Sequence, residues 1–293
     1  FSFLVALWKF SESKKDHIED SNFNASRFRH KHFGAAKFSQ TLFDLSENST
    51  TYAKGLNKAY AQENEDIWLY ENFFYGMVNG VIIESGALDG HKYSTSSLFE
   101  EFANWTAIHI EPDPNSFRGL IQYRPNAINI HSALCTEPKS YHFVTNGAAA
   151  VHGILEFMTD EFLYYHHRKI FKNEDRIAQL PIIPCIPLKY YVRQLHIRHV
   201  DLWVLDVEGA EEVALQGTDF TSVHFSVIMM ECEEWVDKGR NKRKMDILEK
   251  HGYECRLILR NCVCKNKRFK PSSRAIKTEL KLYNGSTYIN EGW

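Results

Sequence analysis

From residue 80 onward, short apolar runs alternate with segments of helical periodicity. The runs are rich in Val, Ile and Leu and almost uninterrupted, which is typical of strands covered on both faces. They span residues 80–84, 107–111, 127–134, 199–206 and 225–231, and helices are predicted at 94–104, 115–123, 210–216 and 242–251. Two last apolar segments, at 253–260 and 262–265, are predicted to form a C-terminal antiparallel pair of strands. The pattern predicts an α/β domain with a mostly parallel sheet and helices on both faces.

The same pattern divides the chain. Residues 1–65 are polar and short of periodic apolar positions, so we expect a mobile N-terminal extension with room for one helix. The α/β domain is predicted to span 66–270, followed by a tail at 271–293. Residues 141–198 interrupt the alternation with aromatic, histidine-rich and proline-rich stretches, and we expect them to form an insertion that caps the carboxyl edge of the sheet.

Composition narrows the class of protein. Of the 293 residues, 44% are hydrophobic and 25% charged, which excludes a disordered, collagen-like or coiled-coil chain. Six cysteines are too few for a disulfide scaffold, and neither Cys-x-x-Cys nor a His/Cys cluster with zinc spacing occurs. Cys262 and Cys264 share one face of a predicted strand, which does not suit a disulfide between them. A core of this size needs neither a structural metal nor a disulfide.

The charge is unevenly distributed. The formal net charge is −2, yet Lys238–Lys281 contains 15 Lys or Arg against four acidic residues, or about +11. This segment is either a solvated basic face or a docking surface for an anionic substrate or a membrane. No nucleic-acid-binding motif is present, so we expect no nucleic-acid partner. Nothing in the sequence indicates an oligomeric state.

Two features bear on the compartment. Asn-x-Ser/Thr sequons at Asn24, Asn48, Asn104 and Asn284 favour a glycoprotein of the secretory route. The apolar Phe1–Trp8 is too short to span a bilayer, and no apolar run of ~18 residues occurs. The segment at residues 1–8 is either the stub of a removed signal peptide or membrane anchor, or a first strand. A secretory or membrane-anchored lumenal location is therefore favoured over a cytoplasmic one.

Acidic residues end four of the five predicted strands of the parallel sheet: Glu84, Glu111, Asp206 with Glu208, and Glu231. One such acid is often only a cap. In a doubly wound sheet, however, ligands bind at the carboxyl ends of the strands. An edge lined by carboxylates suits a ligand with a cation or many hydroxyl donors, and it does not suit a bare phosphate.

The turn after the first strand contains Gly86 and Gly90, which permit a tight turn and a close backbone approach. Their Gly-x-x-x-Gly spacing differs from the Gly-x-Gly-x-x-Gly of a nicotinamide site, and no P-loop Gly-Lys-Ser/Thr follows. Glu111 lies 25 residues after Gly86, where a carboxylate can accept hydrogen bonds from both ribose hydroxyls of an adenosine.

These residues resemble the FkbM-type S-adenosylmethionine-dependent methyltransferases over roughly residues 80–265. The resemblance is carried by Ile83-Glu-Ser-Gly-Ala-Leu-Asp-Gly90, by Ile108-His-Ile-Glu-Pro112 and by Val200-Asp-Leu-Trp-Val-Leu-Asp-Val-Glu-Gly-Ala-Glu211. It implies a Rossmann-like class I methyltransferase fold and methyl transfer, typically to a hydroxyl of a sugar or a small natural product. One departure is the bulky His91-Lys92-Tyr93 after Gly90, where the family usually carries a small residue.

The resemblance also implies site residues. The turn after the first strand would hold the methionine end of the cofactor, the acid ending the second strand would bind the ribose, and the end of the third strand would lie beside the adenine. The residues concerned are Glu84, Ser85, Gly86, Asp89 and Gly90 for the methionine end, Glu111 for the ribose, and Ser132 and Ala133 for the adenine.

Methyl transfer to a hydroxyl requires alignment of the reacting atoms and a base for the proton. The resemblance places Asp206 and Glu208 at the methyl group and acceptor, and with Glu231 they are our candidates for the base. Asp206 and Glu208 could instead hold a divalent cation, and Glu208 could simply favour a helix N-terminus. His152, His166 and His167 of the insertion are further candidates for the base.

We therefore expect an S-adenosylmethionine-dependent methyltransferase that acts on a hydroxyl of a sugar or other polyhydroxylated small molecule or glycan. The alternative is a catalytically inactive binding or trafficking protein that kept the methyltransferase fold, because a fold does not fix a function.

Overall fold

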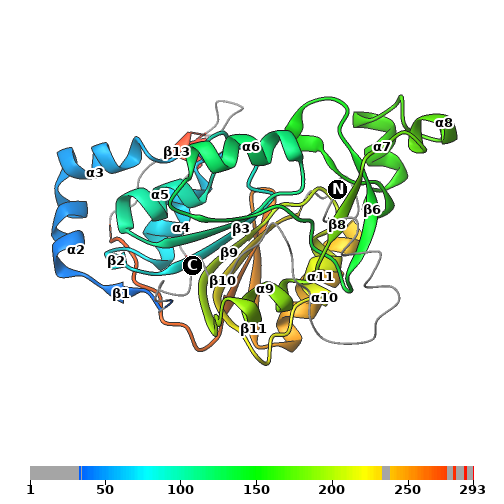
Figure 1. Cartoon of the computed structure of the whole chain (residues 1–293). Coiled ribbons are helices and arrows are strands. Elements are labelled where there is room, and N and C mark those ends of the chain that lie inside the picture. The colour runs from blue at the N-terminus through cyan, green and yellow to red at the C-terminus, as the bar shows by residue number, and fades with distance from the viewer. Residues whose placement is uncertain (1–32, 34, 233–237, 276–279, 282–286, 289–292) are drawn as a thin grey trace.

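The computed structural model describes residues 33, 35–232, 238–275, 280–281, 287–288 and 293. Its centre is a seven-stranded sheet in the order β11-β12-β10-β9-β3-β4-β5 (Figure 1). The strands are β3 (Val81–Ser85), β4 (Thr106–Ile110), β5 (Ile128–Ile130), β9 (His199–Leu205), β10 (His224–Glu231), β11 (Tyr253–Ile258) and β12 (Asn261–Asn266). β12 runs antiparallel to both its neighbours, whereas the pairs formed by β10, β9, β3, β4 and β5 are parallel. The predicted sheet, with its C-terminal antiparallel pair, is confirmed.

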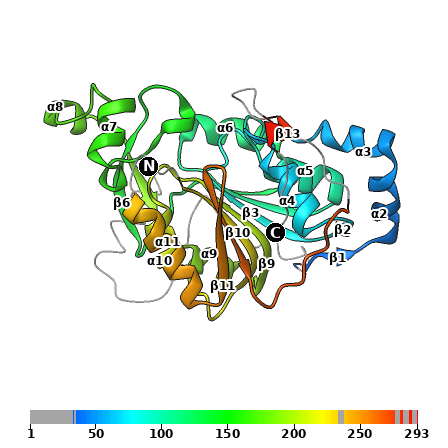
Figure 2. The same ribbon diagram turned by 180° about the vertical axis from the view of Figure 1, so that it is seen from behind.

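Helices cover both faces, as Figures 1 and 2 show from opposite sides. Side chains alternate between two cores: Ile83 and Trp203 face one, and Ile82 and Leu202 face the other. The first core packs against α9 (Leu188–Gln194), α10 (Glu211–Gln216) and α11 (Lys238–Lys250), and the second against α4 (Glu65–Phe73) and α5 (Ser96–Ala103). This period-two burial on both faces explains why the strands contain continuous apolar runs.

The segment expected as an N-terminal extension carries more structure than its sequence indicates. α2 (Gln40–Glu47) and α3 (Ser49–Leu56) form where one helix was expected, and Asn48 both follows α2 and caps the start of α3. Leu42 and Tyr52 are buried in the second core. β1 (Lys37–Phe38) also pairs with β2 (Met77–Val78). The part of this segment expected at residues 1–32 lies outside the described residues.

The insertion folds around its own three-stranded sheet, in the order β7-β6-β8. It comprises β6 (Lys139–Val144), η2 (Ala149–Val151), β7 (Gly153–Ile154), η3 (Leu155–Phe157), α7 (Asp160–His166), α8 (Glu174–Ile177) and β8 (Ile182–Cys185). α7 and α8 lie at the end of the molecule opposite to α2 and α3 (Figure 1). The insertion is joined to the main sheet just after β5, where the Ala133 N–H donates to the Pro184 carbonyl at 3.0 Å.

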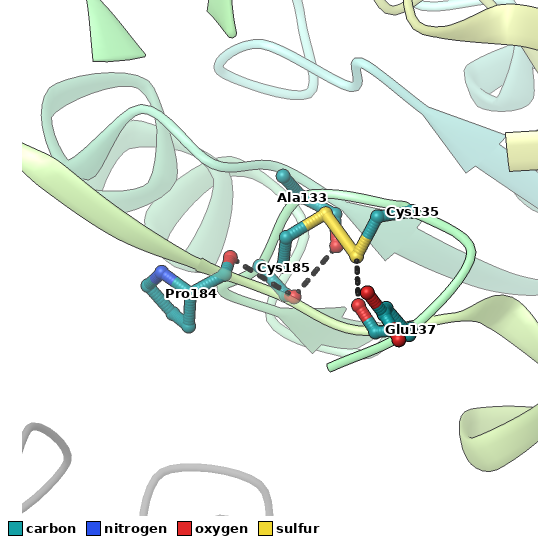
Figure 3. Close-up of a disulfide and its surroundings, with 6 residues drawn as sticks. Ala133, Cys135, Glu137, Pro184 and Cys185 are labelled. Carbon is teal, nitrogen blue, oxygen red and sulfur yellow. Dashed lines mark hydrogen bonds between the residues drawn. A yellow bond between two sulfur atoms is a disulfide. The ribbon is translucent and has the colours of Figure 1, made fainter. Parts of the chain in front are cut away.

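Three disulfides pair all six cysteines: Cys135–Cys185, Cys232–Cys262 and Cys255–Cys264. The first crosslinks the segment after β5 to the last residue of β8, beside Ala133 and Pro184 (Figure 3). Cys262 and Cys264 are not bonded to each other, as expected. The partner of Cys264 follows from strand register, since Cys255 lies directly opposite it with their Cα atoms 4.0 Å apart. Cys262 lies opposite Met230 and bonds to Cys232, just after β10.

Some basic side chains of the C-terminal segment are paired within the molecule. Lys244 is buried and donates to the Glu231 carbonyl, and Arg274 pairs with the buried Glu71. Arg243 bonds to the Glu212 carboxylate. The tail also returns to the domain: Tyr75 N–H donates to the Ser272 carbonyl, and the last described pairing joins β13 (Leu280–Lys281) to β14 (Thr287–Tyr288).

Two expectations from the sequence concern the sequon asparagines and membrane-spanning segments. Asn48 and Asn104 are exposed, whereas Asn24 and Asn284 lie outside the described residues, as does the apolar segment at 1–8. Within the part of the chain that the structure describes, no helix is both long and apolar enough to cross a membrane.

Asp201 is a buried carboxylate that joins three segments distant in sequence. Its Oδ2 accepts the Val81 N–H at 2.9 Å and its Oδ1 accepts the Ala36 N–H at 3.0 Å. The His199 imidazole lies 3.1 Å from the same Oδ1. The start of β9 is thereby fixed to the start of β3, and the N-terminal segment is fixed to both.

We predict that Asp201→Ala lowers the free energy of unfolding by about 2–3 kcal/mol, because buried N–H groups lose their acceptor. Urea denaturation measures the loss. Asp246→Ala is the control, since Asp246 forms only an exposed pair with Lys242 on one helix, and it should cost less than ~0.5 kcal/mol. Equal effects of the two substitutions would contradict this account of Asp201.

Candidate active site

A cavity of about 280 Å³ lies at the carboxyl edge of the parallel strands. Nine of the eleven site residues predicted from the sequence line it, and they come from the ends of five different strands. They are Glu84, Ser85, Gly86, Glu111, Ser132, Ala133, Asp206, Glu208 and Glu231. The edge of an α/β sheet has therefore gathered the strand-end acids into one hollow.

The cavity lies at the switch point of the sheet, where β4 pairs on one side of β3 and β9 on the other. There the loop after β3 touches the loop after β9. Asp206 N–H donates to the Ser85 carbonyl at 3.1 Å, and a Cβ added at Gly86 would collide with the Asp206 carbonyl oxygen. Gly86 also has φ +83°, which favours glycine. Only a residue without a side chain permits this approach.

Glu111 is buried at the end of β4 with each carboxylate oxygen held by one backbone N–H. Oε2 accepts from Leu88 at 2.8 Å and Oε1 from Asp113 at 2.7 Å. Burial raises the pKa of Glu111 to about 8, although both hydrogen bonds act in the opposite direction. Because a carboxylate oxygen has two lone pairs, each oxygen can accept one further donor from a ligand.

Glu84 lies at the end of β3, and its carboxylate is already hydrogen-bonded within the protein. Its carboxylate accepts from the Thr95 N–H at 2.6 Å and the Ser96 hydroxyl at 2.5 Å, and also from the Ser94 hydroxyl. Burial is the main cause that raises its pKa. Glu84 lines the cavity, but its donors come from the start of α5, so it anchors that helix.

Asp89 and Gly90 are absent from the cavity lining, and their predicted contact with a cofactor stays a prediction. The Asp89 Oδ1 accepts the N–H groups of His91 and Lys92 at 2.9 and 2.7 Å, so it closes the turn on itself. The Gly90 carbonyl accepts from Arg124. Of the bulky residues that follow, Tyr93 lines the cavity.

Ser132 and Ala133 lie between β5 and the insertion. The Ser132 hydroxyl donates to the Ala133 carbonyl at 2.8 Å, and that carbonyl also accepts the Ile186 N–H at 3.0 Å. This wall of the cavity is therefore held by the segment around β8, which the Cys135–Cys185 disulfide crosslinks (Figure 3).

Asp206, Glu208 and Glu231 converge at another wall, each offering one oxygen within 4.8 Å of the others. Glu208 has φ +54°, an unusual conformation for a residue with a side chain, and Glu211 holds it there. The Glu211 Oε1 accepts the N–H groups of Val207 and Gly209 at 3.1 and 3.2 Å. The cap position of α10 is Ala210, so Glu208 does not occupy it.

A comparison with protein families identifies the family of this chain. The sequence profile of the Methyltransferase FkbM domain matches residues 84–255, more than half of the chain. The chain belongs to the FkbM methyltransferase family. The matched region contains the carboxyl ends of all five parallel strands and the insertion, so the resemblance expected from the strand-end motifs is confirmed.

Solved structures with a similar fold are distant in sequence. FkbM from Methylobacillus flagellatus KT is 11% identical, over 90% of this chain and 59% of that one, with a TM-score of 0.40. Aeropyrum pernix fibrillarin, a complex with natively bound S-adenosyl-L-methionine, is 14% identical over 71% and 75%, with a TM-score of 0.36. The TehB-like SAM-dependent methyltransferase of Corynebacterium glutamicum is 13% identical over 76% and 98%, with a TM-score of 0.34. Curated protein sequences gave no match.

The family is one of S-adenosylmethionine-dependent methyltransferases, and the expected Rossmann-like class I fold is confirmed. The antiparallel β12 sits between β10 and β11 at one side of the parallel strands. Arg260, from the turn between β11 and β12, and Asn261, the first residue of β12, join the strand ends in the lining of the cavity.

Most residues in two walls of the cavity were not predicted as site residues. Gln62 lies just before α4 and Glu65 is the first residue of that helix, and Gln62 bonds to Arg260 at 2.7 Å. On the other side lie residues 149–154 and Phe162 of the insertion. The insertion therefore reaches the sheet edge that it was expected to cap, whereas the sequence around Gln62 carries no motif that indicates a place in the cavity.

The three histidines named from the sequence separate. His152 and His166 line the cavity, whereas His167 does not. His167 is buried, its Nε2 lies 2.7 Å from the Val151 carbonyl, and burial lowers its pKa. His152 contacts the Asp113 carboxylate through Nδ1 at 2.7 Å.

We predict that Gly86→Ala destabilises the protein by at least ~2 kcal/mol more than Gly147→Ala, as measured by chemical denaturation. Both glycines have positive φ, so both substitutions carry the same kind of backbone strain. Only at Gly86 would the new methyl group meet a backbone carbonyl, since the nearest atom to a Cβ on Gly147 is 4.0 Å away. Comparable losses would show that the two loops are not closely packed.

Proposed function

We propose that this FkbM methyltransferase transfers a methyl group from S-adenosylmethionine to a hydroxyl of a sugar or another polyhydroxylated molecule. The observation that carries the proposal is the set of carboxylates from β4, β9 and β10 in one cavity. A sulfonium cation with an attached ammonium group and ribose hydroxyls is complementary to such a lining. A hydroxyl-rich acceptor likewise offers donors to carboxylate acceptors.

The residues of the cavity fit this cofactor. Glu111 keeps two acceptor positions for ribose hydroxyls, and Gly86 leaves the backbone turn open to close approach. Ser132 and Ala133 would flank the adenine. When bound, S-adenosylmethionine supplies an electrophilic methyl group on a positively charged sulfur.

The chain itself must orient the acceptor and receive its proton. Asp206, Glu208 and Glu231 lie close enough together to hold several hydroxyl groups at once. We assign the proton acceptance to Asp206, which is the most exposed of the three and follows β9 directly. Glu211 and Arg240 act as positioning residues, because both bond to the backbone of the Glu208 loop.

Glu111→Ala is expected to weaken binding of S-adenosylhomocysteine by ~1–3 kcal/mol, since ribose hydroxyls lose their acceptor. Isothermal titration calorimetry measures the change. Asp89→Asn serves as the control, because Asp89 belongs to the neighbouring turn, lies outside the cavity lining and keeps its Oδ1 acceptor when changed to Asn. Unchanged affinity in Glu111→Ala would remove Glu111 from the cofactor site.

Affinity should also depend on pH. The folded pKa of Glu111 is raised to about 8, so below that pH its carboxyl is mostly protonated. A cationic ligand with hydroxyl donors favours the ionised form. S-adenosylmethionine should therefore bind roughly tenfold more weakly at pH 7 than at pH 9. Glu111→Gln should abolish this change in affinity between pH 7 and pH 9. If the variant and the native protein show the same pH profile, the pH dependence belongs to another group.

Asp206→Asn is expected to reduce turnover at least ~100-fold, because an amide does not take up the proton that the substrate hydroxyl loses. Its affinity for the cofactor should stay within severalfold of that of the native protein. Turnover is followed by mass spectrometry of an isotopically labelled methyl group entering a glycan or metabolite extract. Glu212→Gln is the matched control, a nearby carboxylate outside the cavity that pairs with Arg243. A collapse of cofactor affinity in Asp206→Asn would place Asp206 in the cofactor pocket.

The same measurements separate catalysis from binding alone. No detectable heat with S-adenosylmethionine or S-adenosylhomocysteine at tens of micromolar protein would contradict the proposed function.

Methyl transfer is expected to persist after chelation of divalent cations, because in this proposal Asp206, Glu208 and Glu231 act as hydrogen-bond acceptors and base.

We also propose that the protein works in an oxidising compartment of the secretory route. Three disulfides use all six cysteines, and such bonds persist mainly in oxidising compartments. Two of the sequon asparagines, Asn48 and Asn104, are exposed. The cap of α3 uses the Oδ1 of Asn48, whereas a glycan would be attached to its side-chain nitrogen.

Expression with a secretion signal in eukaryotic cells tests this location. The secreted protein should show no titratable thiol without reduction, and N-glycosidase should shift its mass. The shift should decrease stepwise in Asn48→Gln and Asn104→Gln. Six reactive thiols in the native, secreted protein would contradict the proposal.

A further inference from the structure

A buried imidazole nitrogen in the cavity wall has no hydrogen-bond partner in the part of the chain that the structure describes. His152 lies between η2 and β7, and its side chain is 9% exposed. Its Nδ1 bonds to Asp113, but its Nε2 is buried without a hydrogen-bond partner among the described residues. Such orphaned atoms are rare in folded proteins, because a buried polar atom without a partner has lost its hydrogen bonds to water.

Asp113 determines which nitrogen of His152 carries the hydrogen. The Asp113 Oδ1 accepts the N–H groups of Asn115 and Ser116 at the start of α6 (Pro114–Tyr123), and its Oδ2 lies 2.7 Å from the His152 Nδ1. Burial alone would raise the pKa of Asp113, but these hydrogen bonds together lower it. An ionised carboxylate only accepts, so Nδ1 donates and Nε2 of the neutral ring presents a lone pair.

His152 is placed at the adenosine half of the proposed cofactor site. The backbone N–H of its partner Asp113 donates to Glu111 at 2.7 Å, so the imidazole is linked to the proposed ribose acceptor through one residue. His152 lines the same cavity as Pro112 and Ser132. The next residue, Gly153, approaches the other wall, since a Cβ there would lie 3.1 Å from the Glu208 Cβ.

We propose that the Nε2 of His152 accepts a hydrogen bond from the exocyclic amine of the cofactor's adenine, with Asp113 as the positioning residue. This inference rests on the proposed function. Glu111 takes the two ribose hydroxyls, so the amine is the remaining donor on the adenosine half. The contact would make the insertion select adenine, and it would fix the His152–Gly153 segment across the cavity when the cofactor binds.

The test compares two ligands on matched variants by isothermal titration calorimetry at pH 8. S-adenosylhomocysteine carries the amine, and S-inosylhomocysteine carries an oxygen acceptor in its place. His152→Asn keeps a donor near the Nδ1 position and removes Nε2, whereas His152→Gln restores an acceptor near the Nε2 position. Asp113→Asn keeps a good helix cap and removes the carboxylate that fixes the tautomer.

The native protein should bind S-adenosylhomocysteine at least tenfold more tightly than S-inosylhomocysteine. His152→Asn should lose about tenfold for the amine ligand and bring the preference within threefold. Asp113→Asn should also lower the preference, and His152→Gln should retain part of it. Circular dichroism confirms that each variant is folded.

Two results would overturn the inference and leave the proposed function intact. One is equal binding of the two ligands by the native protein, a comparison that needs no variant. The other is a folded His152→Asn that binds S-adenosylhomocysteine within twofold of the native protein. If the native protein binds neither ligand, the proposed function itself fails, and this inference fails with it.

Discussion

The contact between two backbone loops at the centre of the sheet supports the whole site. The loop after β3 meets the loop after β9 so closely that a side chain at Gly86 would strike the Asp206 carbonyl. This approach sets Asp206 against the first turn and defines one wall of the cavity. Glu111 is then placed by register, because β3 and β4 are paired residue by residue. The strand-end acids can share one hollow only while these strands remain in register.

The fold was largely predictable because its strands are buried on both faces. Continuous apolar runs interrupted by helical periodicity admit few arrangements other than a parallel sheet. The sequence did not reveal α2, α3 or the segment around Gln62 as parts of the domain, because they depend on contacts with distant residues such as Arg260. The disulfide partners were hidden for the same reason, since they follow from register and from the position of the insertion.

The site was predictable to the level of strand ends, not of individual contacts. Glu111 and Asp206 line the cavity as their positions implied. Glu84 also lines it, but its carboxylate is taken up by residues at the start of α5. Asp89 turns back on its own loop. A carboxylate binds whichever donors the fold brings within reach, and the sequence alone does not reveal which donors those are.

The most direct measurement is a crystal structure of the protein with S-adenosylhomocysteine. The account predicts density for the nucleoside in the cavity beside Gly86, with the ribose hydroxyls on the Glu111 carboxylate and the homocysteine sulfur facing Asp206. Density at a different place on the surface, or a Glu111 carboxylate that touches only protein in the ligand-bound state, would contradict it.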